Sequence, residues 1–388
     1  MELNSNSIIG IIGAGAMGSG IAQVAASAGH QVYVYDLDAK TLELSKEKLE
    51  VQLHKLQEKG KIFDAPEIIN RLQFVSSLEK LQTCNLIIEA IVENLSIKQQ
   101  VFASLEAIVS EDCILASNTS SLSITSIAAA CQKANRVIGI HFFNPAPLMA
   151  LVEIIPAIQT ETSLSESIKT LLLKWGKIPV IVKDTPGFIV NRVARPFYGE
   201  ALKIYEEGIA DIATIDWALT HIGGFKMGPF TLMDFIGHDV NYIVTETVFK
   251  EFYFDNRYKP SLSQKRLLEA RWLGKKSGRG FYDYAADASK PTANEDLMLG
   301  KQIVDRVVLM LINEAIDALY LKIASKEDID LAMTKGVNYP KGLLIWAEEI
   351  GLQHVLEGLD ALYNTYLDER YRASVLLRKL VAAGEVTF

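Results

Sequence analysis

The chain has 388 residues, of which 49% are hydrophobic and 22% charged, and it carries 39 basic against 47 acidic side chains, a net charge of −8. This composition excludes a disordered chain, and the acidic balance argues against a nucleic-acid-binding protein. The length predicts two or three domains with cores of their own. Three widely spaced cysteines form no metal-binding or CxxC pattern, so we expect reduced thiols, no metal and a cytoplasmic protein.

The first half of the chain alternates short apolar strands with helices. Strands are expected at residues 7–13, 31–36, 86–90, 114–117, 137–143 and 151–155, and the first two helices at 16–28 and 39–60. The opening apolar run is too short for a signal peptide or a membrane span. Strands that alternate with helices indicate a doubly wound, mainly parallel sheet with helices on both faces.

The second half of the chain shows long amphipathic helices and almost no strand pattern. The change falls near Thr185-Pro186-Gly187, so we predict an α/β domain over residues 1–185 followed by helical domains. One helix is expected from Phe188 to Glu207, with a kink near Arg192 because Pro196 lies inside it.

The helical half contains an internal repeat. A shift of 114 residues, without a gap, pairs Arg192 with Arg306, Glu200 with Glu314, Ile215-Asp216 with Ile329-Asp330, Gly228 with Gly342 and Gly237 with Gly351. Glycines in a constant register indicate a tandem duplication. We therefore expect two all-α copies, at residues 186–286 and 294–388, joined in the polar segment 285–292.

A glycine-rich turn follows the first strand directly and opens a helix. Gly13, Gly15 and Gly18 have the GxGxxG spacing, with Ala16 and Met17 between the last two glycines. Gly13 permits the tight turn, Gly15 lets a pyrophosphate approach the backbone, and Gly18 brings helix and strand together. The helix N-terminus offers N–H groups to the phosphates. The turn predicts a dinucleotide site, with a glycine-rich turn that binds nothing as the alternative.

Asp36 ends the second strand, 18 residues after Gly18. A carboxylate at this position accepts the ribose hydroxyls of an adenosine and repels a 2′-phosphate. Asp38 adds a second acid where an NADP enzyme would need a cation. NAD is therefore favoured over NADP, and FAD is the competing dinucleotide, although the sequence holds no further flavin signature.

His141 stands at the end of a strand, at the edge of a parallel sheet where dinucleotides bind. Glu153 follows twelve residues later in an apolar strand, where a carboxylate is costly unless it is paired. A strand–loop–strand unit could bring the two side chains together. Glu153 would then fix the tautomer of His141 and raise its basicity. A structural role is the alternative for a lone histidine.

Two more polar segments are candidates for the same site. Ser117-Asn-Thr-Ser-Ser121 follows an apolar strand, and its hydroxyls could bind a substrate oxygen or, equally, cap the next helix. Asn191 lies in the first turns of the helix after the Pro186-Gly187 turn, where its amide could reach across the cleft between the domains.

Together these segments resemble the L-3-hydroxyacyl-CoA dehydrogenase family, including its 3-hydroxybutyryl-CoA members, from about Ile8 to Tyr284. The segments that carry the resemblance are Gly13–Gly18, Ser117–Ser121, His141–Pro145, Leu151–Glu153 and Lys183–Arg192. The resemblance implies a Rossmann domain with helical domains of the 6-phosphogluconate-dehydrogenase C-terminal type. It also implies NAD-dependent oxidation of (S)-3-hydroxyacyl-CoA, expected to be short-chain, to 3-oxoacyl-CoA in fatty acid metabolism.

The resemblance further implies roles for single residues in the reaction. His141 is the general base for the 3-hydroxyl group and Glu153 is its partner. Ser120 and Asn191 hold the substrate near the nicotinamide, and Ser120 contacts substrate and cofactor alike.

Other residues are implied at the cofactor and at coenzyme A. Asn144, Glu93 and Lys98 are placed beside NAD, and Lys276 near its nicotinamide end. Lys59 matches a lysine at the coenzyme A phosphates, with Lys55 and Lys61 as close alternatives.

The sequence departs from the family pattern at Ala150, where relatives often have lysine, and this leaves the acyl specificity open. Three alternatives stay open as well: a dehydrogenase of a non-thioester hydroxy acid such as gulonate or carnitine, a non-catalytic NAD-binding relative, and one component of a multifunctional β-oxidation system. We expect an acyl-CoA substrate and neither nucleic-acid nor membrane partners. The second helical copy should pack on the first as an internal pseudo-dimer, in a monomer or a homodimer.

Overall fold

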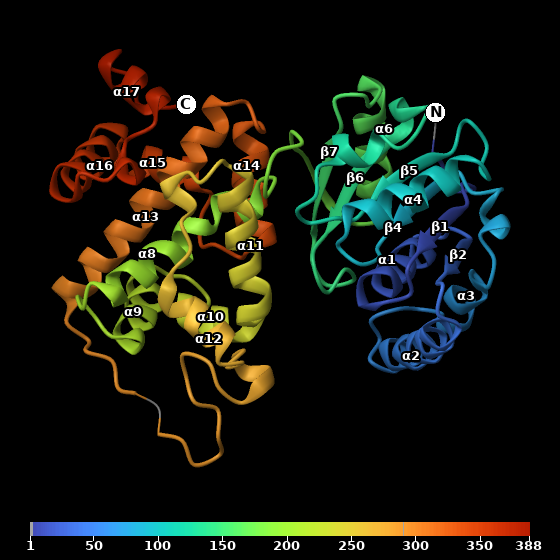
Figure 1. Cartoon of the computed structure of the whole chain (residues 1–388), viewed down its shortest axis with the longest axis horizontal. Helices are drawn as coiled ribbons and strands as arrows, with labels where there is room; N and C mark the ends of the chain where they lie inside the picture. Colours follow the sequence, from blue (N-terminus) through green and yellow to red (C-terminus); the bar gives the residue numbers. More distant parts are fainter. Residues whose placement is uncertain (1–2, 290) are drawn as a thin grey trace. The chain divides into compact units, whose positions relative to one another are not determined.

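The computed structural model describes residues 3–289 and 291–388. The chain divides into two compact units, Met1–Thr185 and Pro186–Phe388. The first unit is a sheet with helices around it and the second is built from helices (Figure 1). Within the described residues, no helix is both long and apolar enough to cross a membrane.

The sheet of the first unit has eight strands in the order β3-β2-β1-β4-β5-β6-β7-β8. Its strands are β1 (Ile9–Ile12), β2 (Val32–Tyr35), β3 (Leu72–Val75), β4 (Leu86–Glu89), β5 (Ile114–Ser117), β6 (Val137–Phe142), β7 (Leu151–Pro156) and β8 (Ile178–Ile181). Neighbouring strands are parallel except β6 and β7, which are antiparallel. The sheet is therefore mainly parallel, as predicted. Two strands were not among those predicted from the sequence: β3, a partly exposed edge strand, and β8.

Helices cover both faces of this sheet, as expected for strands that are apolar throughout. Ile138 and Ile140 point to the face covered by α1 (Ala16–Ser27), α2 (Ala39–Glu58), α3 (Ala65–Asn70) and α6 (Thr162–Lys174). Gly139 points to the other face, which carries α4 (Leu95–Glu106) and α5 (Ile124–Ala128). A Cβ atom on Gly139 would lie 2.8 Å from Ile124, so the glycine lets α5 approach the sheet. His141, two residues further along β6, shares this face.

The α-helices described in the second unit are α7 to α17. They are α7 (Val190–Val193), α8 (Arg195–Glu206), α9 (Ile212–Trp217), α10 (Pro229–Ile236), α11 (His238–Glu251), α12 (Leu262–Glu269), α13 (Leu297–Tyr320), α14 (Lys326–Gly336), α15 (Leu343–Ile350), α16 (Leu352–Tyr366) and α17 (Val375–Ala382). The single kinked helix predicted for Phe188–Glu207 is two helices, α7 and α8, with Ala194 between them. Pro196 lies in the first turn of α8 and offers no N–H to the preceding turn, which accounts for the break.

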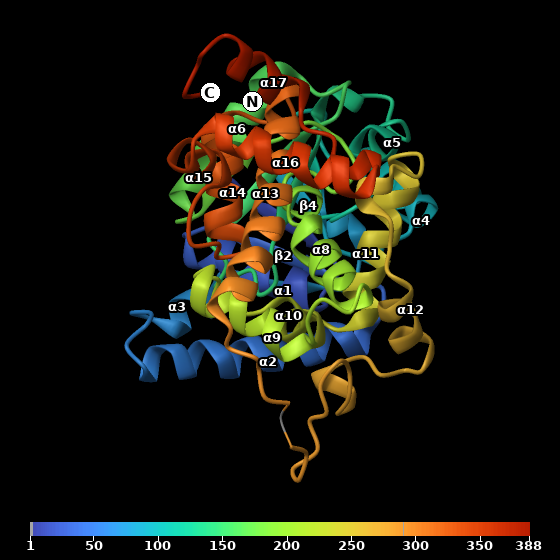
Figure 2. The same cartoon turned by 90° about the vertical axis from the view of Figure 1, so that its left-hand side faces the viewer.

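The two helical copies fold alike, and α8 and α13 pack side by side (Figures 1 and 2). In the first copy the Asp216 carboxylate accepts hydrogen bonds from the N–H groups of residues 230 and 231. In the second copy Asp330 does the same for residues 344 and 345. A side chain on Gly228 or Gly342 would overlap these carboxylates, so both glycines are required. The predicted joining segment 285–292 includes residue 290, which lies outside the described residues.

Candidate active site

The glycine-rich turn joins β1 to α1 in the first unit. Gly13 has a φ of +101°, a conformation that favours glycine. A Cβ atom on Gly18 would overlap the Gly13 carbonyl, whereas a Cβ atom on Gly15 would meet open space. Gly15 is also the N-cap of α1 and has no side chain to bond the first N–H groups, which belong to Ala16 and Met17 onward. This helix end is suited to a phosphate.

Asp36 follows β2 and lies against the glycine-rich turn. Its carboxylate accepts hydrogen bonds from Ala14 N at 2.7 Å and Asp38 N at 2.9 Å. Asp38, which we interpreted as a second acid against a 2′-phosphate, is the N-cap of α2 and accepts from Lys40 N. The glycine-rich turn therefore positions Asp36, whereas Asp38 caps the N-terminus of α2.

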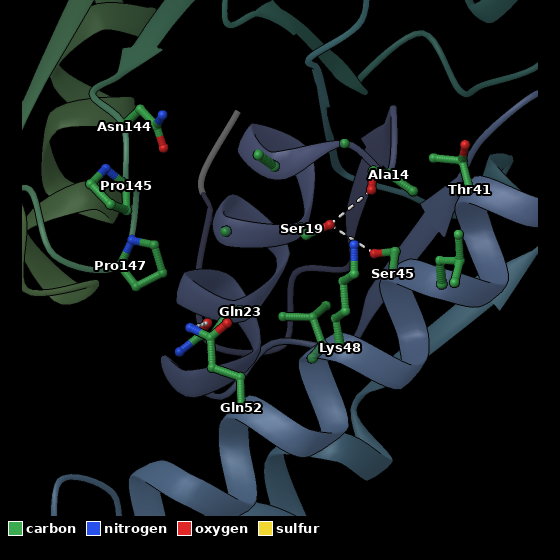
Figure 3. A pocket seen from close by; sticks show the side chains of 15 residues that line it. Ala14, Ser19, Gln23, Thr41, Ser45, Lys48, Gln52, Asn144, Pro145 and Pro147 are labelled. Atoms are coloured by element: carbon green, nitrogen blue, oxygen red, sulfur yellow. Dashed lines mark hydrogen bonds between the residues drawn. The ribbon is translucent and has the colours of Figure 1, made fainter. Parts of the chain in front are cut away.

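A hollow of about 450 Å³ opens beside this turn, between α1, α2 and the segment after β6. In Figure 3, Asn144, Pro145 and Pro147 form one wall, and Lys48 of α2 lies on the opposite side. Between α1 and α2, the Ser19 hydroxyl oxygen lies 2.9 Å from Ala14 O and 2.7 Å from Ser45 Oγ. Asn144 thus faces the glycine-rich turn from the opposite side of the hollow.

His141 and Glu153 are direct partners across the antiparallel strands β6 and β7. Cross-strand partners project from the same face of a sheet, and His141 Nδ1 lies 2.7 Å from Glu153 Oε2. Both side chains are buried. A hydrogen bond from Nδ1–H to the carboxylate leaves the lone pair on Nε2, which is the tautomer that a general base needs. The strand–loop–strand arrangement that we hypothesised is thus the one in the structure.

Glu93 organises the loop that carries Ser120. Its Oε1 atom accepts hydrogen bonds from Thr119 Oγ1 at 2.5 Å, Ser121 Oγ at 3.0 Å and Ser120 N at 3.1 Å. Burial by itself raises the pKa of Glu93, but the Lys98 ammonium and these donors outweigh it, so that the pKa lies below its ordinary value. Glu93 is therefore a carboxylate that fixes a loop by accepting bonds from it.

Lys98 extends this network to Glu89, a residue that the sequence analysis missed. The buried Lys98 ammonium lies 2.6 Å from Glu89 and 3.4 Å from Glu93. Glu89 also accepts a hydrogen bond from Ser117 Oγ at 2.7 Å. An acid at the end of the apolar strand 86–90 was the available signal. The N-cap of α5 is Ser123, so the alternative that one of residues 117–121 caps this helix is wrong.

The three lysines considered for coenzyme A lie at the C-terminal end of α2. Lys55 is in its last turn, Lys59 is its C-cap, and both are exposed. Lys61 lines a second hollow of about 440 Å³, together with Lys174 and Lys177.

Two predicted site residues belong to the helical unit. Asn191 lies on α7, and the Lys276 ammonium is 2.7 Å from Asp239 Oδ2. Their assignment to the site of the first unit stays a prediction. Ala150, the departure from the family pattern, accepts a hydrogen bond from Ile178 N through its carbonyl, which any residue could supply.

Both units match models of a known protein family. Residues 8–185 match the family model "3-hydroxyacyl-CoA dehydrogenase, NAD binding domain", and residues 187–284 and 303–387 each match the corresponding C-terminal domain. The chain is 38% identical to a 3-hydroxyadipyl-CoA dehydrogenase of Escherichia coli K12, over 96% of both chains. It is 44% identical to a probable 3-hydroxybutyryl-CoA dehydrogenase of Deinococcus radiodurans, over 71% of this chain and 99% of that one.

A solved structure of a dehydrogenase with a similar name also resembles this chain. A 3-hydroxybutyryl-CoA dehydrogenase from Escherichia coli K12 superimposes with a TM-score of 0.93 at 36% identity, covering 98% of this chain and 100% of that one. The repeated match to the C-terminal domain also agrees with the duplication seen in the sequence. The chain belongs to the 3-hydroxyacyl-CoA dehydrogenase family.

Proposed function

We propose that this protein oxidises (S)-3-hydroxyacyl-CoA thioesters to 3-oxoacyl-CoA with NAD, and catalyses the reverse reduction. The observation that carries the proposal is the buried pair of His141 and Glu153, in register across β6 and β7. The glycine-rich turn with Asp36, on the same domain, supports the dinucleotide. The family match over both units supports the substrate class.

Residues of this chain transfer the proton of the 3-hydroxyl group. His141 Nε2 takes the proton of the 3-hydroxyl group, and the Glu153 carboxylate stabilises the imidazolium that forms. When bound, NAD would supply the acceptor for the hydride of C3. In the reverse direction the imidazolium donates its proton to the oxygen of the ketone. Glu153 accepts from Nδ1 throughout and keeps the ring in one orientation.

The remaining site residues bind and orient the substrate and the cofactor. Ser120 and Asn191 hold the substrate oxygen, and Glu93 supports Ser120 through the hydrogen bonds of its loop. We assign Asn144, Glu93, Lys98 and Lys276 to the cofactor.

The acyl group is proposed to be short. Relatives named 3-hydroxybutyryl-CoA dehydrogenase support this choice. A dicarboxylyl thioester is the second candidate, because the 3-hydroxyadipyl-CoA dehydrogenase matches nearly the whole chain, second helical copy included. The coenzyme A phosphates are assigned to Lys59, and Lys61, in the hollow at the end of α2, is the competing choice.

The test is NADH oxidation with acetoacetyl-CoA, longer 3-oxoacyl-CoA substrates and 3-oxoadipyl-CoA, each against NADPH as the alternative reductant. Turnover of a short thioester with NADH is expected. Reduction of NAD by gulonate or carnitine, with no turnover of thioesters, would favour the non-thioester alternative. No turnover with any of these substrates would leave a non-catalytic relative and overturn the proposal.

We also propose that one chain forms an internal pseudo-dimer of helical domains in the cytoplasm. The packing of α8 on α13 supports the first point. The free, buried thiols of Cys84, Cys113 and Cys131 support a reducing compartment. Light scattering of the purified chain measures whether it is a monomer or a homodimer.

A further inference from the structure

Lys177 is a buried lysine of the first unit that the reaction does not use. It follows the C-terminal turn of α6, and the residue is 7% exposed. Its ammonium lies 2.6 Å from the carbonyl oxygen of Ala146 and 2.8 Å from that of Met149. Both acceptors belong to residues 143–150, which we call the β6–β7 segment because they join these strands. A charged donor therefore holds a turn that lies between His141 and Glu153 in the chain.

The β6–β7 segment is folded tightly at the point where Lys177 holds it. Pro145 O accepts hydrogen bonds from the N–H groups of Leu148 and Met149, which turns the chain so that the two carbonyl oxygens at 146 and 149 meet at one ammonium. Such charge-assisted hydrogen bonds are among the stronger ones in proteins.

The segment also packs closely on α1, the helix that the glycine-rich turn opens. A Cβ atom on Gly20 would lie 3.1 Å from Pro147 and 3.2 Å from Ala146, so a methyl group there would force the segment away from α1 by a few tenths of an ångström. On this side of the segment lies the hollow of Figure 3, with Asn144 and Pro145 in its wall. Lys177 and α1 therefore hold the segment from two sides and fix how far Asn144 stands from the glycine-rich turn.

A lysine at this position has a cost. Burial lowers the pKa of Lys177, and its two acceptors are neutral carbonyls, which compensate a buried charge less than a carboxylate does. An apolar side chain of the same length would fill the space without that cost. The two hydrogen bonds that hold the β6–β7 segment therefore account for a lysine at this position.

We propose that Lys177 is a positioning residue for the dehydrogenase: it fixes the β6–β7 segment, and through it Asn144, at the cofactor site. The inference rests on the proposed function for the place of Asn144. Lys177 touches neither substrate nor cofactor in this role. Losing its ammonium should weaken NADH binding more than binding of the thioester.

The test compares Lys177→Met with Lys174→Met, which removes an exposed lysine from the same hollow. NADH affinity is measured by fluorescence titration, which needs no turnover, and kcat and both KM values by acetoacetyl-CoA reduction. We expect Lys177→Met to raise the NADH Kd five- to tenfold and to change the KM for acetoacetyl-CoA less than twofold. Lys174→Met should match the wild type in NADH affinity. An unchanged NADH Kd in folded Lys177→Met would overturn the inference.

A double-mutant cycle with Asn144→Ala separates positioning from general destabilisation. If Lys177 acts through Asn144, the double variant binds NADH no more weakly than Asn144→Ala alone. Multiplied effects would overturn the inference, and an Asn144→Ala variant with unchanged NADH affinity would overturn the proposed place of Asn144 instead. Should Lys177→Met not fold, Gly20→Ala displaces the same segment from α1 and should weaken NADH binding alike, and a silent Gly20→Ala would count against the inference.

Discussion

Arg192 of the first helical copy donates to Glu314 of the second, with 2.6 Å between Nε and Oε1, and both side chains are buried. The repeat gives this pair a counterpart. Arg306 of the second copy donates to Glu200 of the first at 3.0 Å. Each copy thus contributes one arginine and one glutamate to the contact between them, in positions related by the same shift of 114 residues.

A tyrosine also donates to the glutamate of each arginine–glutamate pair. Tyr258 donates to Glu314 at 2.5 Å, and Tyr371 donates to Glu200 at 3.0 Å. A two-fold axis relates such contacts in symmetric dimers, where residue i meets residue j twice. The helical unit has this arrangement within one chain, between its two copies, which is what the proposed pseudo-dimer requires.

The first prediction concerns the stability of this contact. Arg192→Met removes the nearer of two cations from the buried Glu314 carboxylate and leaves Arg257 at 3.7 Å, so we expect the free energy of unfolding to fall by about 3 kcal/mol. Urea unfolding, followed by circular dichroism, measures it. Lys250→Met is the control, because it removes an exposed i,i+4 pair with Glu246, which should matter by less than about 1 kcal/mol. An Arg192→Met chain as stable as the control would contradict the role of the pair.

The second prediction follows from the self-complementarity of the first copy. A chain that ends at residue 286 keeps both Arg192 and Glu200, so two such chains can form the same pair of contacts with each other. We expect a homodimer in light scattering, and a monomer when Arg192→Met is added. A truncated chain that is a well-folded monomer without the substitution would count against the pseudo-dimer.

The third prediction separates two glycines of the cofactor turn. Gly15 has a φ of −67° and open space around it, so Gly15→Ala should fold normally and lose NADH affinity tenfold or more, because its methyl group stands where a phosphate approaches. Gly18→Ala should instead lose about 1–3 kcal/mol of stability, because its Cβ overlaps the Gly13 carbonyl. Thermal melting and NADH titration distinguish the two. Equal melting temperatures for both variants would refute the distinction.

The fourth prediction is a pH dependence of stability. Burial lowers the pKa of His30, with smaller contributions from the cations of Arg71 and Lys174, while its hydrogen bond to Ser7 O partly opposes the shift. Below pH 6.5 the unfolded chain takes up a proton that the folded chain does not, so stability falls as the pH falls through this window. The slope is at most about 1.4 kcal/mol per pH unit.

Unfolding in urea at pH 7.5 and at pH 5.5 measures this loss. His30→Asn keeps a donor for Ser7 O but cannot be protonated, so its stability should vary less over the same range. If His30→Asn and the wild type lose equal stability between these values, another group is responsible.

Much of the fold could be predicted because its signals are local. Continuous apolar runs between glycines gave most strands of the sheet, and Pro196 marked the break between α7 and α8. The missed strand β3, Leu-Gln-Phe-Val, lies at the sheet edge and is partly exposed, so neither continuity nor alternation distinguishes it. Its position depends on pairing with β2, which is a tertiary contact.

In the candidate site, too, some contacts could be predicted from the sequence and others could not. The pairing of His141 with Glu153 could be inferred because a carboxylate in an apolar strand requires a partner. The network around Glu93 could not, because its donors lie 26 to 28 residues away. Asp184 is a similar case: it lies in the segment Lys183–Arg192, and its carboxylate accepts a hydrogen bond from Thr125 N at the start of α5. Such partners are set by how loops meet, which a sequence pattern does not encode.

The most direct test of the proposed chemistry is the rate of acetoacetyl-CoA reduction by His141→Gln, with Glu153→Gln beside it. A general acid–base group contributes about 10²–10⁴-fold, so kcat of His141→Gln should fall by at least 10²-fold. Glu153→Gln should fall less, because its amide can still accept from Nδ1. NADH affinity and melting temperature should stay near the wild-type values. A folded His141→Gln enzyme that binds NADH and keeps the wild-type kcat would contradict the assignment.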